Sequence, residues 1–485
     1  MKNEQTRAPA RGWVKKALCA GVIMGLSMTA GMSFAGQKPK ADNGNIMTPF
    51  ARIAKIPVVK DEYGFINYVA TYDKARDVAL AIADYVNDND DRDAGFPADW
   101  IVGGMEGDAT IEESVLKIPS PNPINPDDPD FDPTDPTQIK FANVMDLCNS
   151  YYAKRALGVE PITGIKGDED AKYVVNGYSH APALPCELST WNDDENIYVD
   201  MLDPNAIFSI FFTDVLVSDE MKDPEFASAI AALPVVVKDE IKTVVYKALD
   251  DAGIKYNTKD KPLGPEYKTV EEIFDVVRAS PNTSPYKHVA YTRVDGGAFV
   301  ASDTEAVARA IIEAMSIHGE DGTGGRPAAG THPWDDPAPP NLSAGSKWRS
   351  ARHEPLGLPG INKDVNGKNW VIEACSPKYA KMAMGTGMHH ATALPCEISV
   401  QRVDRGDPAD DVTESLVISY LDPAFMFGAM FSDMTDDEKA ALGHIPGKIS
   451  SDLEYIVQHA LDTLGITSNV GVQFKYTMLP PEVDD

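Results

Sequence analysis

An internal repeat is the sequence feature that most restricts how this 485-residue chain can fold. The eight residues at 180–187 recur at 390–397 with seven identities. Three further blocks recur in the same order, with 148–154 matching 375–381, 202–214 matching 421–433, and 248–254 matching 460–466. Because four matched blocks keep one order, we predict two diverged copies of a single module.

Each copy has the pattern of an α+β module, with a small, mainly antiparallel sheet and helices packed on one face. We predict a first strand at 65–72 and at 286–293, each followed by an amphipathic helix. A strand then ends at the first cysteine of the copy. A short helix and two more strands follow it. The last strand ends at a Leu-Asp-Pro turn, where Asp203 and Asp422 suit the N-cap of a helix. A long helix closes each copy.

The predicted divisions follow from these patterns. They are a signal peptide at 1–35, an N-terminal linker at 36–59, module 1 at 60–257, a linker at 258–283, module 2 at 284–477 and a tail at 478–485.

The matched blocks also resemble the domain of unknown function 302 family. The similarity lies in a Cys-Asn-Pro-like turn before a short helix, a Leu-Pro-Cys strand, and a strand that closes in Asp-Pro before an apolar helix. The first copy departs from this pattern, since Ser150 stands where the second copy has Pro377. The resemblance implies a small α+β module with an antiparallel sheet and implies no reaction.

The N-terminus predicts export. Five basic residues precede an apolar run that ends in the cleavage motif Ser33-Phe34-Ala35, which is typical of a secretory signal peptide. We therefore expect a periplasmic or secreted protein with no stable membrane span after cleavage. Removal of residues 1–35 takes away five basic residues and one acidic residue, which changes the net charge from −30 to −34. Such a charge excludes nucleic acid as a partner and favours a cation, a small ligand or a basic protein.

Two cysteines per copy define the first group of candidate site residues, Cys148 with Cys186 and Cys375 with Cys396. An exported chain with an even number of cysteines in each module favours one structural disulfide per module. The alternative is a thiol site. Cys148 and Cys375 each end a strand directly before a helix, and a helix N-terminus lowers the pKa of a thiol.

Other candidate residues recur beside these cysteines. His180 and His390 come six residues before the second cysteine of each copy, and Asp146 and Glu373 come two residues before the first. Cysteine, histidine and carboxylate together are ligands for soft or borderline metals. The matched lysines, Lys154 and Lys381, suit an anion site or a local ion pair. The sequence thus requires no cofactor, and a bound metal ion is one of the alternatives.

Two functions fit these observations. The first is a non-catalytic binding or interaction protein in which disulfides stabilise both modules. The second is a thiol or metal site used in periplasmic redox chemistry or electron transfer. The chain contains no haem-attachment motif, no nucleophile-elbow motif, no phosphate-binding loop and no zinc-protease motif, so nothing in it indicates a hydrolase or a nucleotide enzyme.

Overall fold

The computed structural model describes about two thirds of the chain as a helical and strand-rich α+β protein. The described residues are 46–88, 100–103, 110–125, 129–130, 132, 138–174, 177–184, 186–279, 284–291, 297, 299–319, 348–350, 369–394, 396–402, 416–466 and 472–473. The predicted signal peptide and the predicted tail lie outside these residues. Within them, no helix is both long and apolar enough to cross a membrane.

The first half of the molecule, residues 46–263, contains a seven-stranded sheet. Its strands are β1 (Phe50–Pro57), β2 (Trp100–Val102), β3 (Leu116–Pro123), β4 (Ile139–Asn149), β5 (Cys186–Asn192), β6 (Asn196–Leu202) and β7 (Asn257–Leu263). Its helices are α1 (Tyr68–Asp88), α2 (Ile111–Ser114), α3 (Ser150–Ala156), α4 (Pro204–Phe211), α5 (Thr213–Leu216) and α6 (Pro224–Asp251), with 3-10 helices η2 (Gly177–Ala183) and η3 (Asp219–Lys222).

The second half, residues 284–473, contains a six-stranded sheet and follows helix α7 (Val270–Ala279). Its strands are β8 (Tyr286–Tyr291), β9 (Arg349–Ser350), β10 (Asn369–Cys375), β11 (Cys396–Arg402), β12 (Leu416–Leu421) and β13 (Val472–Gln473). Its helices are α8 (Ala301–Gly319), α10 (Pro377–Thr386), α11 (Pro423–Met430), α12 (Asp436–Leu442) and α13 (Ile445–Thr463), with the 3-10 helix η4 (Met388–Ala393).

The two sheets have the same antiparallel strand order. In the first half the path is β2-β4-β5-β6-β1-β7, with β3 also paired to β4, and in the second it is β9-β10-β11-β12-β8-β13. The registers agree as well. Leu147 pairs with Cys186 as Ala374 pairs with Cys396, while Phe50 pairs with Leu202 as Tyr286 pairs with Leu421. Positions in the two halves can therefore be compared one to one.

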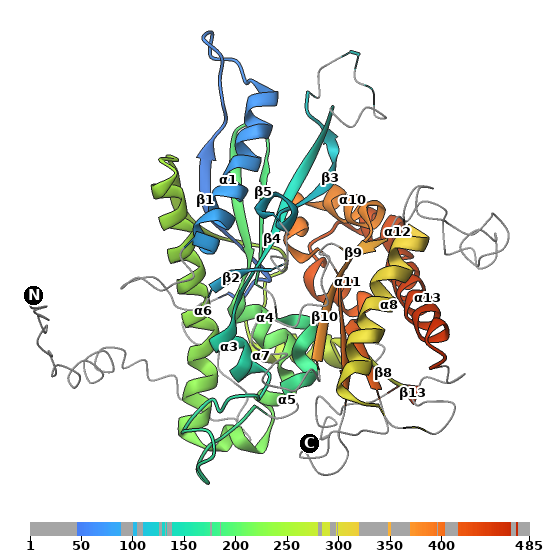
Figure 1. The fold of residues 1–485 in the computed structure, drawn as a ribbon. Helices are drawn as coiled ribbons and strands as arrows, with labels where there is room; N and C mark the ends of the chain where they lie inside the picture. The colour runs from blue at the N-terminus through green and yellow to red at the C-terminus, as the bar shows by residue number, and fades with distance from the viewer. Residues whose placement is uncertain are drawn as a thin grey trace, which may run out of the picture.

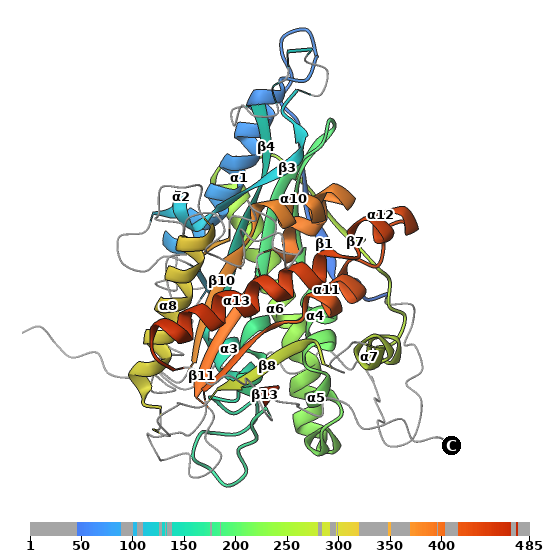
Figure 2. The same cartoon turned by 90° about the vertical axis from the view of Figure 1, so that its right-hand side faces the viewer.

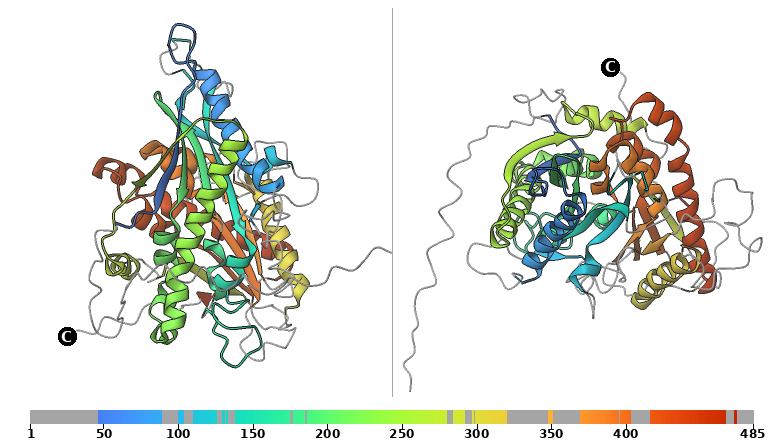
Figure 3. Two further views of the ribbon diagram at one scale, coloured as in Figure 1. Left: turned by 90° about the vertical axis from the view of Figure 1, so that its left-hand side faces the viewer. Right: turned by 90° about the horizontal axis from the view of Figure 1, so that it is seen from above.

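Helices cover one face of each sheet, as the sequence predicts. In the first half α1 packs on β4 and β5 and against α6, and Figure 3 shows α6 running along this outer side. In the second half α8 packs on β10 and β11 and against α13, which Figure 2 shows crossing in front of the strands. Buried side chains from these helices and strands form the two main cores.

The other face of each sheet is covered by the other half of the molecule, because the two halves lie side by side (Figure 1). Helix η4 of the second half packs on β4, β5 and β6, and helix η2 of the first half packs on β10, β11 and β12. A buried hydrogen bond of 2.6 Å joins the hydroxyls of Ser189 and Thr392 across this contact. Each sheet is thus completed by a 3-10 helix from the opposite half.

The predicted first strand at 65–72 is wrong. Helix α1 begins at Tyr68, and the Asn67 side chain accepts a hydrogen bond from the Ala70 amide at 3.0 Å. Phe65 and Val69 are apolar but exposed, so their spacing imitates a strand without burying one face. The first strand of the sheet is β1, which lies in the predicted linker 36–59, and most of β7 with all of α7 lies in the predicted linker 258–283.

The predicted helix ends agree with the structure. Asp203 and Asp422 are N-caps whose side chains accept hydrogen bonds from the backbone amides of Asn205 and Ala424, with a proline at the first helical position in both cases. The long closing helices end before Gly253 and Gly465, which both have φ of +66°, where a residue with a side chain would be strained.

Candidate functional site

Helix η4 places two adjacent histidines, His389 and His390, at the contact between the halves. Gly387 directly precedes the helix. A Cβ atom at this position would lie 2.6 Å from Cε1 of His389 and 3.2 Å from Cε1 of His390. Glycine is therefore required here because any side chain would displace the imidazole rings.

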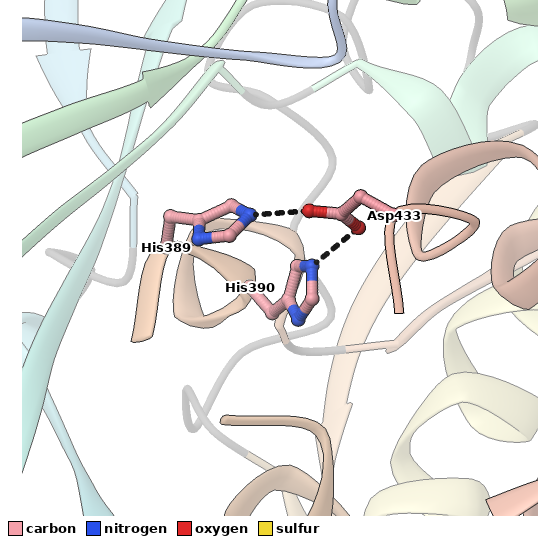
Figure 4. A group of neighbouring side chains, drawn as sticks. All are labelled: His389, His390 and Asp433. Carbon is pink, nitrogen blue, oxygen red and sulfur yellow. Dashed lines mark hydrogen bonds and ion pairs between the residues drawn. The ribbon is translucent and has the colours of Figure 1, made fainter. Parts of the chain in front are cut away.

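Asp433, which follows α11, faces both rings (Figure 4). Its Oδ2 lies 3.2 Å from Nε2 of His389, and its Oδ1 lies 3.2 Å from Nε2 of His390. The three potential ligand atoms all lie within 4.8 Å of one another. The His390 side chain is fully buried, whereas the side chains of His389 and Asp433 are 16% and 28% exposed. The group is thus anchored inside the molecule and accessible from one side.

A hydroxyl of α10 fixes which nitrogen of His390 carries the proton. The Thr386 hydroxyl donates to the Ala383 carbonyl at 2.7 Å, so its oxygen is left to accept from Nδ1 of His390 at 2.9 Å. The Ala383 carbonyl, 3.3 Å from the same nitrogen, can also only accept. Nδ1 therefore carries the hydrogen, and in the neutral ring Nε2 turns a lone pair towards Asp433.

The electrostatics of this arrangement favour a cation between the rings and the carboxylate. Burial lowers the pKa of His390, although Asp433 partly opposes this effect. Burial alone would raise the pKa of the Asp433 carboxyl, but hydrogen bonds from His389 and His390 hold it well below its usual range. In the hydrogen-bonded form a proton of His390 lies between Nε2 and the Asp433 carboxylate, and a metal ion can take the place of that proton.

Aromatic rings from both halves surround the group. Phe431 packs on His390, with ring centroids 4.4 Å apart. Phe50, the first residue of β1 in the first half, meets His389 edge-on at 5.4 Å and His390 at 5.8 Å. The site thus belongs to the second half, but a side chain of the first half packs against it.

The matched position in the first half is a simpler pair. Nε2 of His180 lies 2.8 Å from Oδ1 of Asp214, and both side chains are buried. Phe212 packs on the His180 ring at 4.2 Å, and Tyr286 of the second half lies 6.0 Å away. In the sequence Ser179 stands where the second half has His389. The first half therefore has one histidine facing its aspartate where the second half has two.

Among the described side chains, neither predicted histidine joins a cysteine in a group of metal-ligand geometry. His180 contacts Asp214 and His390 contacts Asp433, and His389, His390 and Asp433 form the one group of metal-ligand geometry within the described ranges. His389 and Asp433 were absent from the predicted site. Asp433 had a signal, since the matched apolar stretch ends in an aspartate in both copies. His389 had none in the repeat, because it is a difference between the copies.

Cys148 and Cys186 lie at one end of the first sheet as separate thiols. Both line an apolar pocket of about 80 Å³ together with Trp100, Tyr152, Phe208, Phe212 and Leu233 among others. Burial, and then the charge of Asp146, raises the pKa of Cys186 to about 12. Burial also raises the pKa of Cys148. Both thiols are therefore protonated at neutral pH, which opposes metal binding and nucleophilic chemistry. Cys375 is buried, and the side chain of Cys396 is outside the described part.

The remaining predicted residues lie apart from the histidines. Asp146 pairs across the sheet with Glu187, and Glu373 pairs with Glu397, so that each half buries two carboxyl groups on neighbouring strands. Lys154 is partly buried on α3, and Lys381 is exposed on α10. In the described site the hydrogen bonds of His390 and Asp433 go to Thr386, Ala383, His389 and each other, and not to either lysine.

Comparison with known proteins reaches only part of the chain. A family model described as "Domain of unknown function DUF302" matches residues 361–449, which include Cys375, Cys396 and all three residues of the histidine and aspartate group. No curated protein matches the chain, and no solved structure matches it. The second half is therefore similar to this family over the segment that carries the site.

Proposed function

We propose that this chain is an exported binding protein that holds one divalent transition-metal ion between His389, His390 and Asp433. The observation that carries the proposal is the placement of the Nε2 atoms of His389 and His390 at 3.2 Å from the two oxygens of Asp433, while Nδ1 of His390 faces other acceptors. A metal ion that replaces the proton in this contact binds the nitrogen lone pair and the carboxylate at the same time.

The ligand set indicates which ions fit. Two imidazoles and one carboxylate suit zinc, copper, nickel or cobalt, whereas calcium and magnesium prefer oxygen ligands alone. A tetrahedral zinc ion with bonds of about 2.0–2.1 Å holds its ligand atoms roughly 3.3 Å apart. Each histidine nitrogen lies 3.2 Å from a different oxygen of Asp433, and one ligand atom from each of the three residues can be chosen so that all lie within 4.8 Å of one another. Three protein ligands leave a fourth position for water or another small donor.

The contact behind His390 supports the same assignment. Histidines that bind metals usually donate their other ring N–H to a carbonyl, carboxylate or water, which fixes the ring and its tautomer. Here the Thr386 hydroxyl and the Ala383 carbonyl accept from Nδ1. The strongly acidic chain, with a net charge of −30, also attracts cations.

A metal titration tests the proposal. Mature protein stripped with a chelator is titrated with cobalt(II), followed by visible absorption, and with zinc(II), followed by calorimetry. We expect one tight site per chain. Asp433→Asn and His390→Ala should each weaken binding by about 100-fold or more, since each removes one of three ligands. Absence of tight binding to the native protein would refute the proposal.

Controls separate a lost ligand from a lost fold. His180→Ala changes the equivalent buried pair in the first half and should leave affinity and stoichiometry unchanged. Asp433→Asn keeps the shape of a partly exposed side chain, and circular dichroism verifies its fold. If His180→Ala weakened binding as much as His390→Ala, the ion would lie elsewhere.

Two further parts of this proposal come from the sequence. We infer that the halves are diverged copies of one module, so that the first half also belongs to the DUF302 family. The equal strand order and the equal register at the cysteines support this. Export rests on residues 1–35, and intact mass of the exported protein tests it, since cleavage after Ala35 leaves Gly36 first. Titration of its free thiols tests the predicted bridges Cys148–Cys186 and Cys375–Cys396.

A further inference from the structure

The metal-site helix is anchored on the opposite half of the molecule. Helix η4, which carries both histidines, packs on β4, β5 and β6 of the first half. The buried bond between Ser189 and Thr392, two residues after His390, joins the two at 2.6 Å. The position of the imidazoles therefore depends on how the halves dock.

Phe50 of the first half is the side chain that reaches the site across this contact. Its ring is fully buried and lies edge-on to His389, at an interplanar angle of 78°. It also contacts His390 and, at 6.5 Å, Phe431. The ring thus contacts both imidazoles and blocks movement of His389 towards the first half.

The backbone around Phe50 holds the ring in place. Gly264, directly after β7, has φ of +86°, and a Cβ atom there would lie 2.9 Å from Cδ2 of Phe50. The Thr48 hydroxyl donates to the Phe50 carbonyl at 2.9 Å. Strand β1 is hydrogen-bonded on both sides, to β6 and to β7. These contacts, which all lie within the first half, fix the position of the ring.

We infer that Phe50 closes the metal site of the opposite half and controls how fast the ion is released. This inference rests on the proposed metal site. A metal ion leaves a three-ligand site when one ligand detaches and an incoming water or chelator replaces it. His389 is the more exposed of the two histidines and the one that Phe50 meets edge-on. Docking of the halves would then set the residence time of the ion.

The opposite half provides a matched control. Tyr286 occupies the position of Phe50 in the register of the second sheet, is buried, and contacts His180 of the first half at 6.0 Å. Tyr286 therefore packs against the pair of His180 and Asp214, which lacks a second histidine. Replacing Tyr286 disturbs the same kind of contact between the halves without touching the metal ligands.

The experiment measures release of cobalt(II) or zinc(II) from the full-length mature protein to excess chelator by stopped flow. We expect Phe50→Leu to speed release by about tenfold, the usual size of an effect exerted through a neighbour of a ligand. Phe50→Tyr keeps the ring and should restore the native rate, and Tyr286→Leu should leave the rate unchanged. In a His389→Ala background the effect of Phe50→Leu should shrink, because Phe50 acts through that ring.

The outcomes separate this inference from the proposed site. If native protein binds no ion, the proposed function fails and the inference fails with it. If it binds one ion but Phe50→Leu releases it at the native rate, only the inference is overturned. Equal acceleration by Phe50→Leu and Tyr286→Leu would also overturn it, since general loosening between the halves would then explain the effect.

Discussion

The two halves place the same histidine and the same aspartate at the same point of one fold and arrange them differently. In the first half His180 and Asp214 lie 2.8 Å apart and are buried, so that one proton satisfies both. In the second half two histidines face Asp433 at 3.2 Å, and the group is accessible from one side. One added histidine thus gives the second half a group with the geometry of metal ligands, where the first half has a single hydrogen-bonded pair.

The length of the helix after the first cysteine explains the different proton positions. Helix α3 ends at Ala156, whereas α10 continues three residues past the equivalent Ala383, to Thr386. This extension brings a hydroxyl to Nδ1 of His390. Nδ1 of His180 has no hydrogen-bond partner within the described structure, so its proton is free to sit on Nε2 and bind Asp214. A difference outside the site therefore decides which nitrogen can accept a metal.

The third residue of the first strand also differs between the two halves. Arg52 forms a two-bond ion pair with Asp200, whereas the equivalent His288 bonds to the Ser419 hydroxyl. Burial, and then the neighbouring His180, lowers the pKa of His288 to about 3. Since the unfolded pKa is about 6.5, the unfolded chain takes up this proton first, and stability falls as pH drops from about 6.5 to about 3.

Acid titration of His288 gives the largest expected effect. At about 1.4 kcal/mol per unit of pKa, the loss between pH 6.5 and pH 3 reaches at most about 5 kcal/mol. Denaturant unfolding at a series of pH values measures it. His288→Gln cannot take up the proton and should flatten this part of the pH profile relative to the native protein. An unchanged difference between the two proteins across this range would show that His288 titrates normally.

Removal of the Thr386 hydroxyl is expected to have an intermediate effect. Thr386→Val keeps the shape of the side chain but removes the nearer of the two acceptors of His390 Nδ1, so that only the longer contact to the Ala383 carbonyl still favours the hydrogen on Nδ1. We expect metal affinity to fall by about tenfold, or about 1.4 kcal/mol. Val159→Thr, at the equivalent sequence position of the first half, should have no effect on affinity. Equal affinity of Thr386→Val and native protein would remove the tautomer argument for the site.

The sequence predicted the parts of the fold that depend on local pattern. The matched blocks predicted that the second cysteine of each half lies at an equivalent position in its sheet. Asp203 and Asp422 were recognisable as N-caps from the proline that follows each of them. The error at 65–72 arose because exposed apolar residues imitate a strand. Strand β1 was missed because it lies before the first matched block.

The candidate site was only half visible from sequence. His390 and the aspartate at the end of the matched stretch could be read from the repeat, but their contact spans 43 residues and depends on how α11 packs. His389 is a difference between the copies, and a comparison that looks for identities passes over it. Phe50 reaches the site from the other half, which no local pattern encodes.

The smallest expected difference between the halves concerns the start of the helix after the first cysteine. The Asn149 side chain accepts from the amides of Tyr151 and Tyr152 at 3.0 and 3.4 Å, whereas the equivalent Ser376 makes no side-chain cap bond. Asn149→Ala should therefore lower the free energy of unfolding by about 1 kcal/mol, the usual loss for an N-cap.

Ser376→Ala provides the matched control and should lose less cap stabilisation than Asn149→Ala, because the Ser376 side chain makes no bond to the first helical amides and Pro377 already fixes the first helical residue. Urea unfolding of both variants gives the two values under identical conditions. Equal losses would mean that Ser376 caps α10 in solution, and the two helices would then begin alike. A loss confined to Asn149→Ala would show that the halves stabilise the same turn by different means, a side-chain cap in one and a proline in the other.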